Sequence, residues 1–294
     1  MTLMLVDIAT VYYRAYYALP DTQVSPDGRQ INAVRGTLDA LMLLVDKYQP
    51  AHLVTCWDFA WRPEWRVELL PTYKTARVAD EGAEQMPDTL SDQVDSIRTI
   101  LTEWGVDVIG LEDYESDDIV GSYCRTHPGS IKVVTGDRDL FQLINDEHPV
   151  EVLYLATGVS KHTNANNAYI LERYGIHSHQ YGDFSILRGD ASDGLPGVKG
   201  IGEKTAAKLL TTFGNISGVI EAARSGSPEI KPKASEALLS SLDYLSAAEQ
   251  VVLLNKVLDV PAPNSTWRSP QNSAHADELG LKRYNSGWQS VTDY

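Results

Sequence analysis

Residues 131–139 read Ile-Lys-Val-Val-Thr-Gly-Asp-Arg-Asp, a mostly apolar run that ends in two carboxylates. A short apolar run of this kind is typical of a β-strand buried on both faces of a parallel sheet. We expect the strand to cover Ile131–Asp137. Similar runs in the first 160 residues predict further strands at Leu3–Asp7, Leu53–Asp58, Val106–Leu111 and Glu151–Ala156.

Amphipathic segments lie between these runs. Apolar residues recur three or four positions apart in Ile31–Tyr48 and in Asp88–Trp104, which predicts a helix in each segment. A shorter helix is predicted at Asp118–Arg125. Strands that alternate with helices predict an α/β fold, with a central, mostly parallel sheet and helices packed on both of its sides.

The strand pattern stops at about residue 165, and helical segments separated by Gly- and Pro-containing turns follow. We therefore predict an α/β core over residues 1–164, a helical region over 165–260 and a C-terminal tail over 261–294. The predicted helices of the second region are Asn167–Tyr174, Tyr181–Leu187, Lys204–Phe213, Ile216–Ala223 and Ala234–Leu254. Apolar residues that could fix the tail to the body are Trp267, Leu279, Leu281 and Trp288.

The composition sets limits on the class of protein. The 294 residues include 25 Lys+Arg and 40 Asp+Glu, which gives a net charge of −15. No run approaches the roughly 20 apolar residues that span a bilayer, and the N-terminus lacks the basic region of a signal peptide. We expect a cytoplasmic protein with no membrane partner. Taken alone, the net charge argues against a nucleic-acid partner, because phosphate binding requires a basic surface.

Acidic residues gather where the predicted strands end. Because the carboxyl ends of parallel strands meet at one edge of a sheet, we expect these side chains to converge there. A single Asp in such a place is more often a turn or helix-cap residue. Many carboxylates at one edge repel one another unless cations are bound to them. The converging residues are Asp7, Asp58, Glu115, Asp117, Asp118, Asp137, Asp139, Asp190 and Asp193.

An all-oxygen ligand set favours Mg²⁺ or Mn²⁺ over zinc. No EF-hand loop with its twelfth-position Glu is present, and the seven His residues show no metal-ligand spacing. Multi-metal carboxylate sites commonly catalyse in-line displacement at phosphorus. The carboxylates therefore predict a metal-dependent centre for in-line phosphoryl displacement.

Basic and aromatic residues follow the strand that ends at Asp58. A guanidinium or ammonium group from this segment could stabilise charge on a phosphate, and an aromatic ring could stack on an unpaired base. An ordinary solvated helix face with a half-buried Tyr explains the same spacing. The residues concerned are Arg66, Tyr73, Lys74 and Arg77.

A second motif lies in the helical region, where residues 195–205 read Leu-Pro-Gly-Val-Lys-Gly-Ile-Gly-Glu-Lys-Thr. A P-loop does not fit, because Glu203 intervenes before Lys204-Thr205 and a proline, not a strand, precedes the loop. A helix-hairpin-helix fits better, since Gly-rich turns and a helix N-terminus can hold a phosphate. Residues 195–234 contain six Lys/Arg and three Glu, a local charge of +3. A basic surface is therefore present, but it is local.

Taken together, these blocks resemble the 5′-nuclease family, which contains flap endonucleases and the 5′→3′ exonuclease domain of bacterial DNA polymerase I. The matching blocks occur in family order and cover roughly residues 3–255. They are Asp7 with Tyr13-Arg14-Ala15-Tyr16, Asp58, Tyr73-Lys74 to Arg77, Glu115 to Asp118, Thr135 to Asp139, and Gly189 to Thr205.

The resemblance implies a structure-specific nuclease that hydrolyses DNA at 5′ flaps and 5′ ends with two or more Mg²⁺ or Mn²⁺ ions. It implies a helical arch at about residues 66–95 and a helix-three-turn-helix (H3TH) motif at about 185–213. Lys74 and Arg77 match the residues that polarise the phosphate, and Tyr73 matches the base-stacking position. The tighter metal site would use Asp7, Asp58, Glu115, Asp117 and Asp118, and the looser one Asp137, Asp139, Asp190 and Asp193.

The resemblance also implies a DNA-binding set and partners. Family members often hold K⁺ on backbone carbonyls of the hairpin. The expected substrates are DNA with 5′ flaps, nicks or recessed 5′ ends, the candidate protein partners are a DNA polymerase or ligase, and the expected state is a monomer. The DNA-binding residues would be Arg14, Arg66, Tyr73, Gly197, Lys199, Gly200, Gly202, Lys204, Thr205 and Lys208.

Two segments depart from the family pattern. Asp7-Ile8-Ala9 replaces the expected Asp-Gly-Ser, and the segment after Arg77 is acidic where relatives tend to be basic or Pro-rich. These departures leave open a non-catalytic module that binds branched DNA. No polymerase segment follows within the sequence, so we expect a free-standing nuclease.

Overall fold

A six-stranded sheet forms the centre of the molecule. In the computed structural model, which describes residues 2–79, 84–264 and 272–286, the strands lie in the order β3-β2-β1-β4-β5-β6. The first five strands are parallel, and β6 pairs antiparallel with β5 at the edge. The strands are β1 (Leu3–Asp7), β2 (His52–Trp57), β3 (Asp107–Gly110), β4 (Ile131–Thr135), β5 (Val150–Tyr154) and β6 (Thr163–Ala165).

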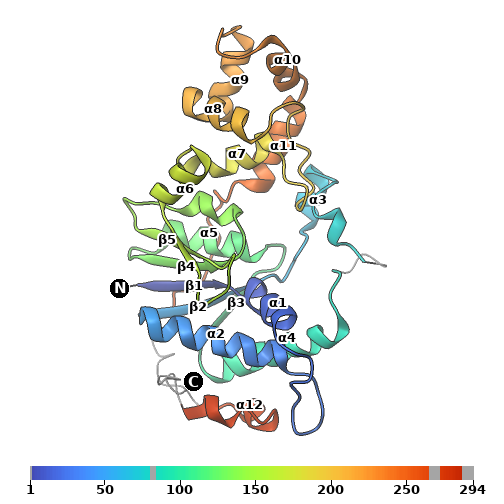
Figure 1. The fold of residues 1–294 in the computed structure, drawn as a ribbon, viewed down its shortest axis with the longest axis vertical. Helices are drawn as coiled ribbons and strands as arrows, with labels where there is room; N and C mark the ends of the chain where they lie inside the picture. Colours follow the sequence, from blue (N-terminus) through green and yellow to red (C-terminus); the bar gives the residue numbers. More distant parts are fainter. Residues whose placement is uncertain (1, 80–83, 265–271, 287–294) are drawn as a thin grey trace.

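Helices cover both faces of the sheet and extend the molecule in one direction (Figure 1). The helices of the α/β part are α1 (Ile8–Ala18), α2 (Asn32–Tyr48), α3 (Glu64–Leu69), α4 (Asp88–Glu103) and α5 (Ser116–Thr126). Those of the helical part are α6 (Asn167–Tyr174), α7 (Tyr181–Arg188), α8 (Glu203–Phe213), α9 (Ile216–Arg224), α10 (Pro232–Ser240) and α11 (Leu242–Val252). Short elements complete the chain: η1 (Thr75–Arg77), η3 (Asp139–Leu143), η4 (Ser178–Gln180), α12 (Ala274–Glu278) and η6 (Lys282–Ser286).

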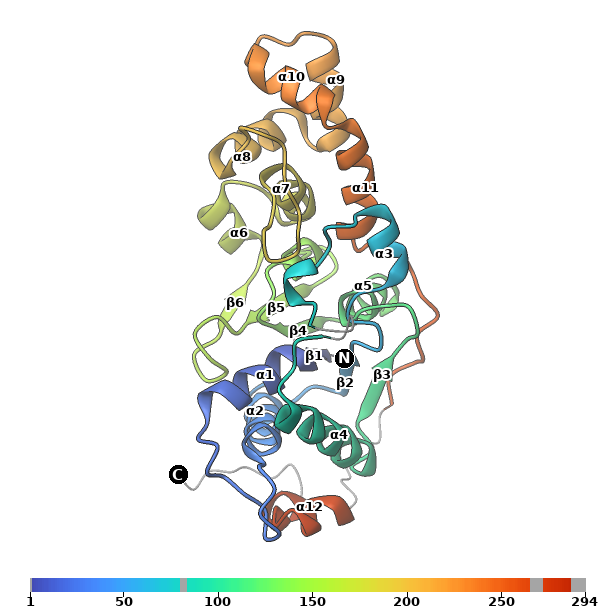
Figure 2. The same ribbon diagram turned by 90° about the vertical axis from the view of Figure 1, so that its right-hand side faces the viewer.

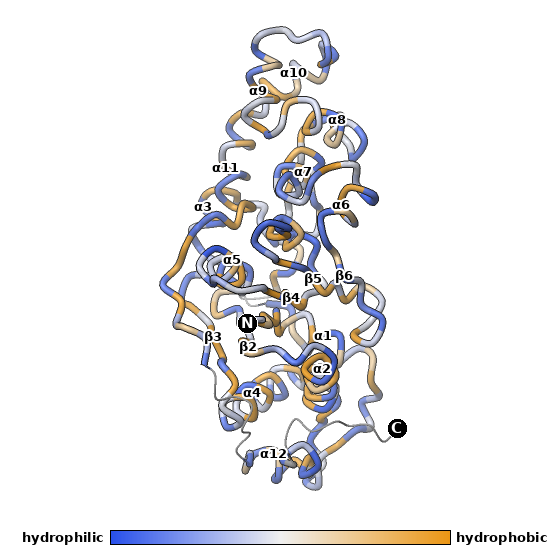
Figure 3. The backbone as a smooth tube through the Cα atoms, turned by 90° about the vertical axis from the view of Figure 1, so that its left-hand side faces the viewer, coloured by the Kyte–Doolittle hydropathy of each residue, from blue (hydrophilic) through white to orange (hydrophobic). Residues whose placement is uncertain are grey.

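Strand β1 shows how the sheet divides the core. Side chains of a strand point alternately to its two faces. Leu3 and Leu5 belong to the cluster formed with α5 and the helical part, whereas Met4 and Val6 belong to the cluster formed with α1, α2 and α4. Helices on both faces explain why the strand sequences are continuously apolar. Figure 3 shows hydrophobic and hydrophilic residues alternating along the covering helices.

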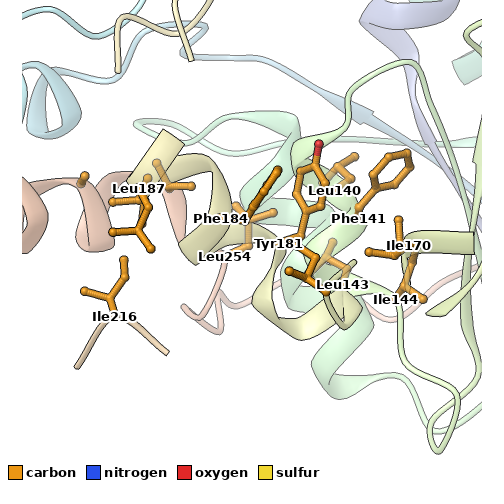
Figure 4. Close-up of a cluster of buried hydrophobic side chains, with 14 of the residues drawn as sticks. Leu140, Phe141, Leu143, Ile144, Ile170, Tyr181, Phe184, Leu187, Ile216 and Leu254 are labelled. Atoms are coloured by element: carbon orange, nitrogen blue, oxygen red, sulfur yellow. The ribbon is translucent and has the colours of Figure 1, made fainter. Parts of the chain in front are cut away.

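The first of these two clusters continues without interruption into the helical part. Phe141, Tyr181, Phe184 and Leu187 carry it from the sheet toward α8 and α11 (Figure 4). The helical part therefore shares its core with the α/β part. The expected boundary at residues 164 and 165 remains a prediction.

The sequence predictions for the sheet are confirmed, with every predicted strand present to within a few residues. Helix α6 matches its predicted bounds, but the predicted helix over Ala234–Leu254 is two helices that meet at Ser241. Elements that were not predicted are α1, α3, β6 and α12. The arch expected at residues 66–95 contains the end of α3, η1 and the start of α4, while residues 80–83 lie outside the described part.

Part of the C-terminal tail packs onto the body. Leu279, Leu281 and Tyr284 are buried against the side of the sheet that carries α2 and α4. Trp267 and Trp288, also expected to fix the tail, lie outside the described residues. Within the described ranges, no helix has the length and apolar character needed to cross a membrane.

Candidate metal centre

The carboxyl ends of the central strands bring the predicted carboxylates together. Asp7 ends β1 and is 5% exposed, and its Oδ2 accepts hydrogen bonds from Thr10 Oγ1 at 2.6 Å and Thr135 Oγ1 at 2.8 Å. Burial, followed by repulsion from Asp58, raises the pKa of Asp7 to about 6. The two hydroxyls fix the carboxylate at the rim of the sheet without neutralising its charge.

Asp58 follows β2 and accepts a hydrogen bond from the backbone N–H of Ser116 at 2.7 Å. Ser116 is the first residue of α5, so the positive end of the helix dipole faces this carboxylate. Glu115 and Asp118 form a capping box at the same helix end. The prediction that this helix starts at Asp118 was two residues late, and the earlier start places Asp117 in the first turn.

Asp117, Asp137 and Asp139 form the most strongly repelling group. Burial and the charge of Asp137 raise the pKa of Asp117 well above its usual range. Burial and repulsion from Asp193 raise the pKa of Asp137, and burial and Asp137 raise that of Asp139. The three side chains line one pocket, whose lining also includes Lys74, Glu115 and Asp193.

The remaining two carboxylates lie in the loop between α7 and α8. Asp190 Oδ2 is 3.2 Å from Arg188 Nη2, and Asp190 Oδ1 accepts the backbone N–H of Ser192 at 3.0 Å. Asp193 is 8% exposed and pairs with Arg77 at 2.7 Å. The loop that precedes the hairpin therefore reaches the edge of the sheet.

The two predicted phosphate-polarising cations lie inside this group. Lys74 Nζ is 2.5 Å from Glu115 Oε2, and the Lys74 backbone N–H donates to the Asp193 carbonyl at 3.1 Å. Burial alone would lower the pKa of Lys74, but Glu115 raises it well above its usual value. Lys74 and Arg77 thus each hold one carboxylate of the cluster in an ion pair.

Two residues of the predicted DNA-binding set are placed differently from expectation. Arg66 is 3% exposed and pairs with Asp118, so it does not reach a DNA surface. Tyr73 is 6% exposed, and its hydroxyl donates to Glu115 at 3.0 Å, so its ring cannot stack on a base where it lies. Arg66, on α3, and Tyr73, in the turn after it, both point toward the first residues of α5, where they contact Asp118 and Glu115. Asp118, predicted as a metal ligand, has both oxygens occupied by Arg66.

The other carboxylates fit a divalent metal. In the described part of the chain, no Lys or Arg lies within ion-pair distance of Asp7, Asp58, Asp117, Asp137 or Asp139. Among the residues that the structure describes, no group of three His, Cys, Asp or Glu side chains is close enough together to hold a metal ion as placed. Buried carboxylates that repel one another are a hard-oxygen ligand set whose charge a divalent cation would balance. The donor set therefore fits Mg²⁺ or Mn²⁺.

The predicted hairpin, Gly197–Thr205, connects α7 to α8 and has two kinds of side chain. Val198 and Ile201 are each 3% exposed and anchor the loop in the core. Gly197 has φ +69°, and a Cβ there would lie 2.6 Å from the Arg188 carbonyl oxygen, so only glycine fits. The exposed residues are Lys199, Gly200, Gly202, Lys204 and Thr205, followed by Lys208 on α8.

The exposed lysines and the start of α8 form a surface suited to phosphate. Gly202 is the N-cap of α8, and the first N–H groups of a helix point outward with partial positive charge. Lys208 lies 3.5 Å from Glu229 in an exposed ion pair, which leaves it accessible. Arg14, the remaining member of the predicted set, is half-buried beside Gly136, next to Asp137. It lies near the carboxylates, far along the sequence from the hairpin.

Thr10, Thr135 and Arg62 also shape the site but were not predicted. Arg62 Nε donates to the Tyr73 carbonyl at 2.6 Å and so holds the turn that carries Lys74. Thr10 lies one helical turn after Asp7, and Thr135 precedes Gly136-Asp137. The three-residue spacing between Asp7 and Thr10 could have predicted their contact from the sequence. The contact from Thr135 crosses strands and could not be read without the strand order.

Comparison with known proteins gives matches over nearly the whole chain. Residues 2–175 match the model of the 5′-3′ exonuclease N-terminal resolvase-like domain, and residues 176–274 match that of the 5′-3′ exonuclease C-terminal SAM fold. A 5′-3′ exonuclease of Streptomyces coelicolor is 44% identical over 281 residues, covering 94% of this chain and 93% of the relative. DNA polymerase I of Mycobacterium bovis is 33% identical over 285 residues, which cover 95% of this chain but 30% of that polymerase.

A solved structure supports the fold. A bacteriophage T5 flap endonuclease in a pseudo-enzyme-product complex with DNA and metal ions superposes with a TM-score of 0.66 at 19% identity. The match covers 86% of this chain and 89% of that protein. At that identity the likeness establishes the shared fold, a mostly parallel sheet followed by a helical region.

Proposed function

The chain belongs to the 5′-3′ exonuclease family, and from this premise we propose that it is a metal-dependent, structure-specific 5′ nuclease. It would hydrolyse DNA phosphodiesters at 5′ flaps and 5′ ends, near the junction of single strand and duplex. The observation that carries this proposal is the group of five buried or half-buried carboxylates without a cationic partner in the described part of the chain. A merely structural cluster would be expected to balance such charge.

The metal-holding residues that we propose are those whose charge is unbalanced: Asp7, Asp58, Asp117, Asp137 and Asp139. Glu115, Asp190 and Asp193 would complete the set from the rim. Divalent ions bound there would lower the pKa of water and balance charge on the scissile phosphate. We propose Mg²⁺ or Mn²⁺, because every donor is an oxygen.

Lys74 and Arg77 are the proposed catalytic residues. Their ion pairs with Glu115 and Asp193 place both cations among the carboxylates, where a phosphate could be bound. Lys74 is largely buried and Arg77 is half-exposed, and a fixed positive charge shielded from water stabilises an anion more strongly than one in water does. Their role would be to orient the phosphate and stabilise its developing charge.

The hairpin is the proposed duplex-binding element. The exposed Lys199, Lys204 and Lys208, with the start of α8, would contact phosphates on one strand. Contacts of this kind carry no base preference, which fits an enzyme that recognises DNA structure. We also propose that hairpin carbonyls can bind K⁺.

Further parts of the proposal concern organisation and partners. We propose an α/β core over residues 1–164, a helical DNA-binding region over 165–260 and a C-terminal segment over 261–294 that partly packs back on the core. The protein would act as a monomer and in sequence with a DNA polymerase or ligase. A non-catalytic branched-DNA module is not favoured, because the carboxylates that it would not need are all retained.

Product mapping on a labelled 5′-flap duplex tests the proposal. Cleavage near the junction in Mg²⁺ or Mn²⁺, and none in EDTA, is expected. Asp117→Ala should abolish turnover while the variant still binds the junction. Unchanged cleavage by Asp117→Ala would refute the assignment, and junction binding without product in either metal would favour the non-catalytic module.

A further inference from the structure

Arg66 is a buried cation that joins three elements of the fold. It lies on α3 and is 3% exposed. Its Nη1 and Nη2 donate to Asp118 of α5 at 2.7 and 2.8 Å, and its Nε donates to the Val251 carbonyl of α11 at 3.1 Å. One side chain thus connects the base of the arch segment, the helix at the carboxylate edge and the last helix of the helical part. Figure 2 shows α3 lying beside α11 and close to α5.

The contacts of Arg66 make the surroundings of Asp118 different from those of the adjacent Asp117. Both oxygens of Asp118 accept from the guanidinium, and Oδ2 also accepts the Glu115 backbone N–H at 3.2 Å. Asp117 has no such ion pair within the described residues, and the charges that act on it are those of Asp137 and Asp7, together with Lys74 and Glu115. Successive residues of a helix point about 100° apart, so the two side chains face different surroundings. A bidentate pair with an extra backbone donor leaves Asp118 little capacity for a metal ion.

Arg66 also acts on Glu115 and Lys74. Its Nη1 is 3.5 Å from Glu115 Oε1, while Lys74 contacts the other oxygen, Oε2. Backbone hydrogen bonds from Leu70 N–H to the Arg66 carbonyl and from Tyr73 N–H to the Leu70 carbonyl, both 2.8 Å, form the turn that leads to Lys74. The position of Lys74 therefore depends on where Arg66 is anchored.

An aromatic contact fixes α3 from its outer side. The Trp65 ring lies 4.6 Å from the Arg66 guanidinium carbon and 3.3 Å from Lys256 Nζ, and its Nε1 donates to the Asp113 carbonyl at 3.0 Å. Lys256 follows α11, and Asp113 precedes α5. The aromatic contacts and the Arg66 contacts hold the same three segments together.

We propose that Arg66 is a positioning residue that removes Asp118 from the metal-binding set and ties the metal centre to helix α11. The inference rests on the proposed function, because it concerns the same carboxylate cluster. Asp118 then serves as the anchor of the arginine, and Asp117 is the ligand contributed by the first turn of α5. Second-layer contacts of this type commonly set ligand orientation and metal affinity.

Metal binding to the DNA-free protein tests this inference without relying on catalysis. Mn²⁺ affinity is measured by calorimetry and by the electron paramagnetic resonance signal of free Mn²⁺, on the full chain and at a temperature where each variant is folded. The matched variants are Asp117→Asn and Asp118→Asn. Asp117→Asn should lose most of its Mn²⁺ affinity, whereas Asp118→Asn, which weakens only the anchor of Arg66, should lose about tenfold, as expected for Arg66→Lys. Equal losses in the two variants would overturn the inference.

A third variant, Arg66→Lys, keeps the charge but cannot form the bidentate pair. It should lower Mn²⁺ affinity by about tenfold, and it should lower kcat while the KM for flap DNA stays nearly constant. Unchanged Mn²⁺ affinity and kcat would show that Arg66 has no positioning role. Should Arg66→Lys fail to fold, the two aspartate variants decide the assignment of Asp118. Failure of the unaltered protein to cleave a flap would refute the proposed function and leave the Mn²⁺ comparison intact.

Discussion

At the carboxylate edge the charged side chains are buried or half-buried and contact one another, whereas the lysines of the hairpin are exposed. Lys74 and Arg66 belong to the first region and pair with Glu115 and Asp118. Lys199 and Lys204 belong to the second and extend from a loop anchored by Val198 and Ile201. Buried charges act strongly on a bound group, while exposed charges are screened by salt. We therefore propose that the carboxylate edge carries out the reaction and that the hairpin provides DNA affinity that depends on salt.

The largest expected effect comes from one carboxylate of the buried region. Asp117→Asn should lower kcat by about 10³-fold or more, because it removes a proposed metal ligand and its charge at the reacting phosphate. Single-turnover cleavage of a 5′-flap duplex measures it. Dissociation constants for the same DNA in Ca²⁺ should change little. A large loss of binding with intact kcat would show that the division of roles is wrong.

A smaller effect is expected from the cation beside Glu115. Lys74→Ala should reduce kcat by about 10²-fold, since it removes one fixed positive charge from the phosphate. The measurement is kcat and KM on the same flap substrate. Lys132→Ala is the matched control, because Lys132 also pairs with a glutamate but lies at the amino end of β4. Equal losses in the two variants would contradict a specific role for Lys74.

Changes in the hairpin should alter affinity and its salt dependence. The double variant Lys199→Ala/Lys204→Ala should bind duplex DNA roughly tenfold more weakly at moderate salt. The slope of log affinity against log salt should fall by about one for each lost phosphate contact. Titrations at several salt concentrations measure both effects. A slope identical to that of the unaltered protein would exclude these lysines from the interface.

Two glycines of the hairpin give a matched pair. Gly197→Ala should lower the free energy of unfolding by about 1–3 kcal/mol, because φ is +69° and the new Cβ would meet the Arg188 carbonyl. Gly200→Ala should cost less, since φ is +82° but nothing lies within 4 Å of the added Cβ. Denaturant unfolding measures both. A larger loss of unfolding free energy in Gly200→Ala than in Gly197→Ala would contradict the close approach of Gly197 to the Arg188 carbonyl.

The pH dependence of stability should depend on metal. Burial raises the pKa of Asp7 to about 6 and that of Glu115 to about 7, so the folded, metal-free protein binds protons more tightly than the unfolded chain. Its stability should therefore fall as the pH rises from about 4 through 7. Mn²⁺ competes with these protons and should remove the loss, shifting the melting temperature by a few degrees at pH 7.5. Melting curves with and without Mn²⁺ measure this, and identical pH profiles would contradict it.

The prediction drawn from net charge alone, that the chain does not bind nucleic acid, was misleading. The charge of −15 argued against nucleic acid, but nine of the acidic residues belong to the predicted carboxylate set and the basic residues of 195–234 are concentrated locally. Charge summed over the whole chain cannot distinguish carboxylates gathered at one edge from those spread over the surface. The position of each charge along the predicted elements was the informative quantity.

Local patterns in the sequence were sufficient to predict the sheet, the hairpin and the carboxylate set. Apolar runs such as Leu3–Asp7 and Ile131–Asp137 have a strong local signal, because strands buried on both faces leave no polar position. Gly197 and Gly200 mark turns through their backbone freedom, which is also a local property. Helix α1 was missed, since Ile8–Ala18 is rich in Tyr and directly follows a strand without a turn residue.

Which charges face one another depends on the packing of the elements and could not be read from the sequence. The residue types and the spacing of Arg66 and Tyr73 would be the same whether their segment lay on the surface or folded inward. The sequence therefore could not show that both side chains are buried. The contact of Arg66 with Asp118 and Val251 joins residues separated by 52 and 185 positions. Pairings across such distances depend on how the elements pack in three dimensions. For that reason, the sequence identified the carboxylates, and the fold determined which of them have a cationic partner among the described residues.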